Sequence, residues 1–161
     1  MSIKSKLTCL CLTCLLPLAS GCVKTPMLYH GKAVSTAPVV AFQEGRPTTG
    51  EWKTSDLTID YKYIQKGVDL EISGQAALSQ SNQMLYSIVS RMDAYIFFLD
   101  KDSRVIETDY FVNEWTTNTQ DFQNFSKSYK VPTGATGFSF GYSGELKGVD
   151  STDTIYELPL K

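Results

Sequence analysis

The chain has 161 residues, of which 42% are hydrophobic and 20% are charged, and its 15 basic and 17 acidic side chains give a net charge of −2. A protein that binds nucleic acid through its phosphates needs a concentrated basic face. Here the lysines and arginines between Lys62 and Lys130 are scattered among acids. We therefore expect no nucleic-acid partner.

Residues 1–21 predict a signal peptide. Lys4 and Lys6 precede a 12-residue apolar run, 7–18, which is followed by the small residues Ala19, Ser20 and Gly21. A basic start, a short apolar stretch and a small-residue cleavage site are typical of a secretory leader. The run is too short to cross a bilayer as a helix, which needs about 20 residues. The sequence thus predicts export.

The tetrapeptide Ala19-Ser20-Gly21-Cys22 resembles the lipobox of bacterial lipoproteins. This resemblance implies that 1–21 are removed, that Cys22 becomes acylated, and that three acyl chains anchor the protein to the lipid bilayer without spanning it. Val23 stands where similar enterobacterial lipoproteins of the inner membrane have Asp, which implies an outer-membrane address facing the periplasm. The residues alone leave open a plain secretory cleavage near Ala19.

Cleavage before Cys22 would remove every other cysteine, because Cys9, Cys11 and Cys14 all lie in the leader. The mature domain would then have 13 basic and 17 acidic side chains, a net charge of −4. It could contain neither a disulfide nor a cysteine nucleophile or thiolate metal site.

Residues 22–50 predict the lipidated cysteine and a flexible tether, because the segment is rich in Pro, Gly, Ser and Thr. A flexible chain of this length averages about 30 Å end to end. The apolar stretch 37–42 leaves a second interpretation open, an edge strand or a segment that docks on a partner.

Residues 51–161 predict one β-sandwich domain. Leu57, Ile59 and Tyr61 alternate with polar residues, and the alternation resumes after 65–67, which is typical of a hairpin. The stretch 92–99 is apolar at nearly every position, as in a central strand that is covered on both faces. Further alternating segments follow at 105–112, 128–131, 137–146 and 154–160.

These segments predict an all-β sandwich of seven to eight antiparallel strands. One segment, 83–92, also fits a helical pattern through Leu85, Ile88, Val89 and Met92. If it were helical, the fold class would be α+β.

The stretch Leu70-Glu71-Ile72-Ser73-Gly74, followed by Tyr86, by Ile96-Phe97-Phe98-Leu99-Asp100 and by Val105-Ile106, resembles the FxLYD-type domain of secreted and lipid-anchored bacterial proteins. The resemblance covers about residues 57 to 142 and implies an immunoglobulin-like sandwich that serves as an envelope accessory module. Ser103 stands where the turn of that family usually has Gly.

No residue pattern predicts catalysis, a metal site or a cofactor. The single histidine, His30, lies in the expected tether, so a serine triad would lack its base. Asp100 and Asp102 flank Lys101 and predict a turn instead of a calcium loop. We therefore expect a protein that is not an enzyme.

The segment 113–125 is the candidate binding loop, because Trp115, Phe122 and Phe125 lie among amide side chains. Exposed aromatic rings of this kind anchor protein interfaces or stack on sugars. The leading hypothesis is binding of another envelope protein; the alternative is glycan or peptidoglycan binding. A structural role, in which the rings close the end of the sandwich, also stays open.

Overall fold

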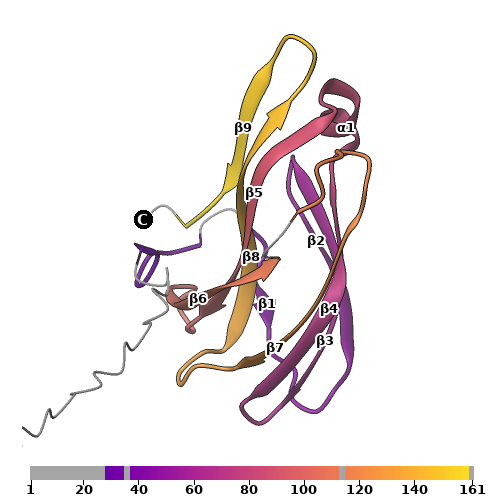
Figure 1. Cartoon of the computed structure of the whole chain (residues 1–161). Coiled ribbons are helices and arrows are strands. Elements are labelled where there is room, and N and C mark those ends of the chain that lie inside the picture. The colour runs from indigo at the N-terminus through magenta and orange to yellow at the C-terminus, as the bar shows by residue number, and fades with distance from the viewer. Residues whose placement is uncertain (1–27, 35–36, 113–114, 160–161) are drawn as a thin grey trace, which may run out of the picture.

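The computed structural model describes residues 28–34, 37–112 and 115–159. Within these ranges the chain forms nine strands and one short helix, arranged as two facing antiparallel sheets (Figure 1). The predicted all-β sandwich is confirmed, with nine strands in the described ranges where seven to eight were predicted, because β2 (Thr48–Lys53) forms in a segment that the sequence analysis did not identify as a strand. The α+β alternative is wrong, because the helix has only 6 residues.

The first sheet contains β1 (Val40–Ala41), β5 (Ile88–Leu99), β6 (Val105–Val112), β8 (Gly137–Lys147) and β9 (Thr152–Glu157). Its order is β1-β8-β5-β6, and β9 pairs with β8 as well. The second sheet, in the order β2-β3-β4-β7, contains β2 (Thr48–Lys53), β3 (Leu57–Lys66), β4 (Asp69–Leu78) and β7 (Gln123–Lys130). The helix α1 (Gln80–Leu85) lies between β4 and β5 in the chain.

The strand order is that of an immunoglobulin-like sandwich. In such sandwiches strands G, F, C and C′ form one sheet, and B lies beside E in the other. Here β9, β8, β5 and β6 follow one another in the first sheet, and β4 lies beside β7 in the second. The chain crosses between sheets from β4 to β5, from β6 to β7 and from β7 to β8, so these six strands take the positions B, C, C′, E, F and G.

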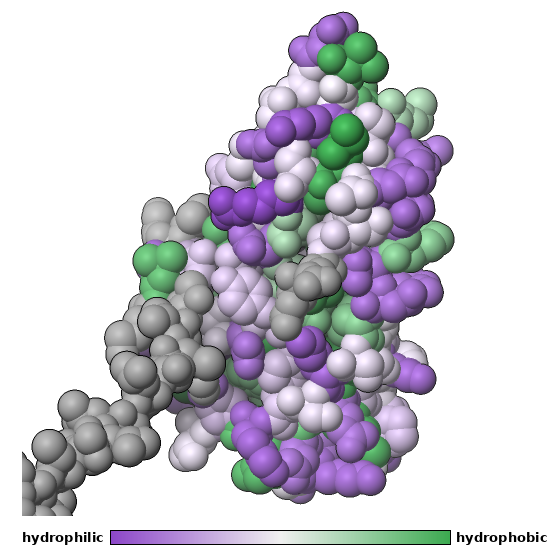
Figure 2. Space-filling model, viewed as in Figure 1, coloured by the Kyte–Doolittle hydropathy of each residue, from purple (hydrophilic) through white to green (hydrophobic). Residues whose placement is uncertain are grey.

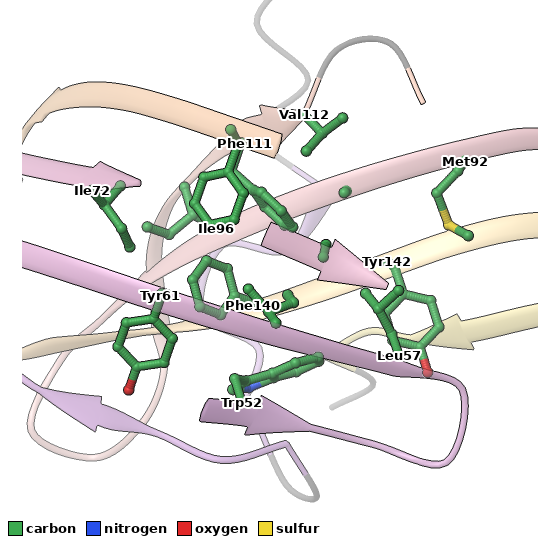
Figure 3. Close-up of a cluster of buried hydrophobic side chains, with 14 of the residues drawn as sticks. Trp52, Leu57, Tyr61, Ile72, Met92, Ile96, Phe111, Val112, Phe140 and Tyr142 are labelled. Atoms are coloured by element: carbon green, nitrogen blue, oxygen red, sulfur yellow. The ribbon is translucent and has the colours of Figure 1, made fainter. Parts of the chain in front are cut away.

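The two sheets are held together by packed aromatic rings (Figure 3). Phe140 of β8 is the central ring, fully buried except for 1% of its surface. Its centroid lies 5.0 to 6.3 Å from those of five other aromatic side chains: Trp52, Tyr61, Phe111, Phe125 and Phe138. Most of these pairs are edge-to-face, the geometry that aromatic quadrupoles favour.

The outer face of the first sheet carries a second apolar cluster. Tyr95, Phe97 and Leu99 of β5 point away from the second sheet and are buried nonetheless, because residues 28–34 cover them. We call residues 28–34 the strap. Tyr29 of the strap is 7% exposed, and its ring centroid lies 5.9 Å from that of Tyr95 and 5.3 Å from that of Phe97. Strand β5 is thus covered on both faces, as predicted.

Backbone hydrogen bonds tie the strap to the β5–β6 turn and the start of β6. The Gly31 N–H donates to the Val105 carbonyl at 2.8 Å, the Val105 N–H donates to the Lys32 carbonyl at 2.9 Å, and the Val34 N–H donates to the Ser103 carbonyl at 3.0 Å. The Arg104 guanidinium adds a bond to the Gly31 carbonyl at 3.0 Å. The strap therefore belongs to the folded body.

The prediction of a flexible tether over 22–50 is wrong for the parts of this segment that form regular structure or dock on the body. Residues 28–34 form the strap, β1 pairs with β8 as an edge strand, and β2 begins at Thr48. The edge-strand interpretation of 37–42 is confirmed for Val40 and Ala41. The Pro- and Gly-rich composition predicted a flexible segment, but side chains of the body hold parts of it in place. For example, the indole N–H of Trp52 donates to the Pro38 carbonyl at 3.1 Å.

Two boundaries also differ from the predicted ones. The segment 83–92 is divided, since α1 ends at Leu85 and β5 begins at Ile88. Strand β7 begins at Gln123, earlier than the predicted 128, because it pairs along its whole length with β4.

The β5–β6 turn is organised by Asp100, as the sequence indicated. Its carboxylate accepts the backbone N–H groups of Asp102 and Arg104, both at 2.9 Å. These bonds, with that of Arg104 the most important, lower the pKa of Asp100. Ser103 in the same turn adopts a φ of 58°, in the left-handed region that favours glycine.

Replacing Phe140 with Ala should lower the free energy of unfolding by about 3–5 kcal/mol, since the cavity would remove contacts with both sheets. Phe140→Leu should cost less, because it keeps part of the volume. Urea unfolding measures both. Phe122→Ala, at a ring that is 63% exposed, is the control and should change stability by no more than about 0.5 kcal/mol. Equal losses at 122 and 140 would contradict this packing.

Ser103→Gly should stabilise the protein by about 0.5–1 kcal/mol, because glycine adopts a positive φ without a Cβ penalty. Gly67 in the β3–β4 turn has a φ of 59° and open space around its Cα, so Gly67→Ser is the matched reverse change and should destabilise by a similar amount. Thermal unfolding of both variants measures the effect. Shifts of the same sign would contradict the turn geometry.

Candidate interaction surface

One end of the sandwich exposes an unusual amount of apolar surface. Among the described residues nine large apolar side chains are exposed, and five of them lie at this end: Met84 (79%), Leu85 (66%), Ile88 (49%), Phe122 (63%) and Val149 (96%). We call these five residues the α1-end surface. Figure 2 shows hydrophobic surface at the upper end of the molecule, where Figure 1 places α1 and the β8–β9 hairpin.

The helix α1 projects two of these side chains. The Ser79 hydroxyl caps its start by accepting the Asn82 N–H at 3.4 Å, and Tyr86 ends it in an extended conformation. Asn82 is the buried residue of the helix, so it faces the body. Met84 and Leu85 are consequently left facing solvent.

The neighbouring loops are fastened to α1. The Gln120 amide donates to the Gln83 carbonyl at 2.6 Å, and the Thr119 hydroxyl donates to the Tyr86 carbonyl at 2.7 Å. On the other side, Gly148 at the tip of the β8–β9 hairpin approaches the Leu85 carbonyl. The helix α1, residues 119–120 and the tip of the β8–β9 hairpin are thus held together at this end of the sandwich.

A polar cluster lies beneath this end and joins the two sheets. The phenol of Tyr142 donates to the Asp56 carboxylate at 2.9 Å and lies 2.8 Å from the Thr54 hydroxyl. The Asn82 amide donates to the same carboxylate at 3.3 Å. Because these groups bond to one another, the cluster supports the end of the sandwich.

Only one of the three predicted binding residues has an exposed ring. Phe122 is 63% exposed, whereas Phe125 is 7% exposed and lies in β7 against Phe111, at a centroid distance of 4.9 Å. Trp115 is half-buried and packs against the core. Phe125 therefore belongs to the core between the sheets, away from the end that the sequence analysis expected it to close in a structural role, and Trp115 packs against the same core. A platform of three stacked rings for a sugar is not formed.

Sequence reasoning missed the other four residues of the surface. Leu85 and Ile88 were noted only as part of a possible helical pattern, and Met84 and Val149 belonged to no predicted site. The available signal was local: Met84 and Leu85 are adjacent, and both cannot face inward on so short a helix. Val149 follows Gly148 between the predicted strands 137–146 and 154–160, where an apolar residue has no strand to cover it.

The remaining residues that the sequence analysis singled out are Cys22 and His30. Cys22 lies outside the described residues. His30 lies in the strap, where its Nδ1 is 2.8 Å from the Ile106 carbonyl. Within the described ranges no three His, Cys, Asp or Glu side chains lie together as a metal-binding group. No helix in that part of the chain is long and apolar enough to cross a membrane.

Comparisons with protein-family models, with curated proteins and with solved structures give no match to this chain. The functional argument therefore depends on the sequence and on the geometry described above.

Tyr142→Phe should alter the stability at alkaline pH. Burial is the main cause that raises the pKa of Tyr142 above its usual 10.0, so the folded state keeps the phenolic proton longer than the unfolded state does. The stabilisation is complete below about pH 10 and is lost as the pH rises further. Removing the phenol should make the fall in unfolding free energy above pH 10 less steep, by up to about 1.4 kcal/mol per pH unit.

Chemical denaturation at several pH values measures this slope. Phe140→Leu, which weakens the core without removing an ionisable group, is the control and should lower the free energy of unfolding at every pH without changing the slope. An identical alkaline slope for Tyr142→Phe and the unaltered protein would show that Tyr142 ionises as freely in the fold as outside it.

Proposed function

We propose that this chain is a non-catalytic, lipid-anchored binding module of the bacterial envelope. In this proposal Cys22 carries the acyl chains at the outer membrane, and the α1-end surface binds another envelope protein. The observation that carries the binding role is the gathering of five exposed apolar side chains at one end.

The composition of this surface suits a protein partner. Met, Leu, Ile, Val and Phe side chains supply apolar contact area, and exposed apolar clusters on soluble domains mark interaction sites. Met adapts to irregular partner surfaces because its side chain is unbranched. The underlying end is fixed by hydrogen bonds from Thr119, Gln120 and Tyr142, so little ordering entropy would be lost on binding.

Acidic side chains border the same surface. Asp121 accepts from the Thr116 hydroxyl at 3.1 Å, and Asp153 accepts from the Tyr86 phenol at 3.0 Å. Asp150 lies beside Val149 in the hairpin tip. The partner that fits such a surface is apolar at its centre and basic at its edge.

The glycan alternative has weaker support, because Phe122 is the one exposed ring of the predicted loop. Its separate test is retention on isolated peptidoglycan. Retention that is lost in Phe122→Ala and kept in Leu85→Asp would favour the glycan over the protein partner.

Photocrosslinking in living cells tests the proposed partner. A photoreactive residue at Met84 or Val149 should trap a discrete protein species, and Leu85→Asp introduced beside it should remove that species. Val68, which is 60% exposed in the β3–β4 turn, is the matched control position at the opposite end of β3. Crosslinks at Val68 that equal those at Met84, or none at Met84 and Val149, would refute the proposed surface.

A further inference from the structure

The strap limits how far the folded body can stand from an anchor at Cys22. Residues from Leu28 onward belong to the described body, because Tyr29 is buried and Gly31 and Val34 are hydrogen-bonded to the β5–β6 turn and β6. Only the six Cα–Cα steps from Cys22 to Leu28 remain. They span at most about 22 Å when fully extended.

The strap also fixes where the short connection leaves the body. Tyr29 packs on Tyr95 and Phe97, which lie on the outer face of the first sheet. Figure 1 shows the indigo strap on the left, on the side of this sheet that faces away from β2, β3 and β4. Leu28, 62% exposed, is therefore part of this outer face.

The length of β5 places the α1-end surface out of reach of the anchor. Ile88 begins β5, and Tyr95 lies seven residues further along the strand, a distance of about 23 Å. The connection from Cys22 to Leu28 spans at most about 22 Å, so it is too short to let the end of the body at Ile88 reach the bilayer. The second sheet lies about 10 Å from the first, on the side opposite the strap. To place the second sheet on the bilayer, the connection would have to pass around the edge of the first sheet.

The rest of the outer face suits the surface of a bilayer. Tyr156 of β9 is 58% exposed there, next to Ile155, whose side chain faces the core. Tyrosine, with an apolar ring and a polar tip, favours the interfacial region. Two charged pairs on this face, Arg91 with Asp93 at 2.9 Å and Lys147 with Glu145 at 3.3 Å, add no net charge against anionic headgroups. Lys32 of the strap lies over the Tyr29 ring, with its Nζ 5.6 Å from the ring centroid, and adds a positive charge to the same face.

We propose that the outer face of the first sheet, marked by Leu28 and Tyr156, lies against the lipid bilayer, and that the α1-end surface is thereby held clear of it. This inference depends on the proposed lipidation of Cys22. Docking of the strap leaves five residues between Cys22 and Leu28, where the sequence predicted a tether of about 28 residues. The anchor would therefore hold the body in one orientation.

Site-specific fluorescence quenching tests this orientation on the lipidated full-length protein. The mature chain has no free thiol when Cys22 is a thioether, so one introduced cysteine takes the dye at a single position. Leu28→Cys and Tyr156→Cys report on the outer face, and Met84→Cys and Ser126→Cys report on the α1 end and the opposite sheet. The protein is placed in phosphatidylethanolamine and phosphatidylglycerol vesicles that contain a lipid with a quenching headgroup.

Dyes at 28 and 156 should be quenched and dyes at 84 and 126 should not. Insertion of about ten Gly and Ser residues after Lys24 is the matched control, since it lengthens the tether without touching the folded body and should remove the difference. Equal quenching at all four positions, or stronger quenching at 84 or 126, would overturn the orientation. Mass spectrometry of the same sample detects acylated Cys22, so a missing anchor is distinguished from a wrong orientation.

Discussion

The structure depends on the need to cover both faces of β5. Ile96 and Phe98 point between the sheets, while Tyr95, Phe97 and Leu99 point the opposite way, and all five are buried. The second sheet can cover only the inner face. The outer face would expose several aromatic rings to water, each with a transfer free energy of about 2 kcal/mol or more, unless another segment packed on it.

The strap provides that cover, and its position has consequences beyond packing. Tyr29 and Val34 contribute the apolar contacts, and Leu158 near the end of β9 closes the cluster from the other side. Because residues 28–34 are held in this way, the chain leaves the body from the outer face of the first sheet. The proposed membrane orientation and the proposed free α1 end both follow from this one packing requirement.

Much of the fold could be predicted because strands leave local periodic signals. Alternation identified β3, β4 and β8, and the unbroken apolar run of β5 predicted cover on both faces, but no local signal identified the segment that supplies it. Tyr29 is a single aromatic residue among Pro, Gly and Ser, and its partner Tyr95 lies 66 residues away. The candidate surface was predicted poorly because it also depends on contacts between distant segments. Strand β7 starts at Gln123 because it pairs with β4, and this pairing turns the side chain of Phe125 inward. Phe122, one step outside the strand, remained exposed as expected.

Amide hydrogen exchange over residues 28–34 tests this account most directly, because every later step needs a docked strap. The amides of Gly31 and Val34 donate to backbone carbonyls of the turn and of β6. We predict that they exchange as slowly as the Val105 amide, which donates back to the strap. Exchange at 31 and 34 at the rate of an unstructured peptide, with Val105 still protected, would contradict the account.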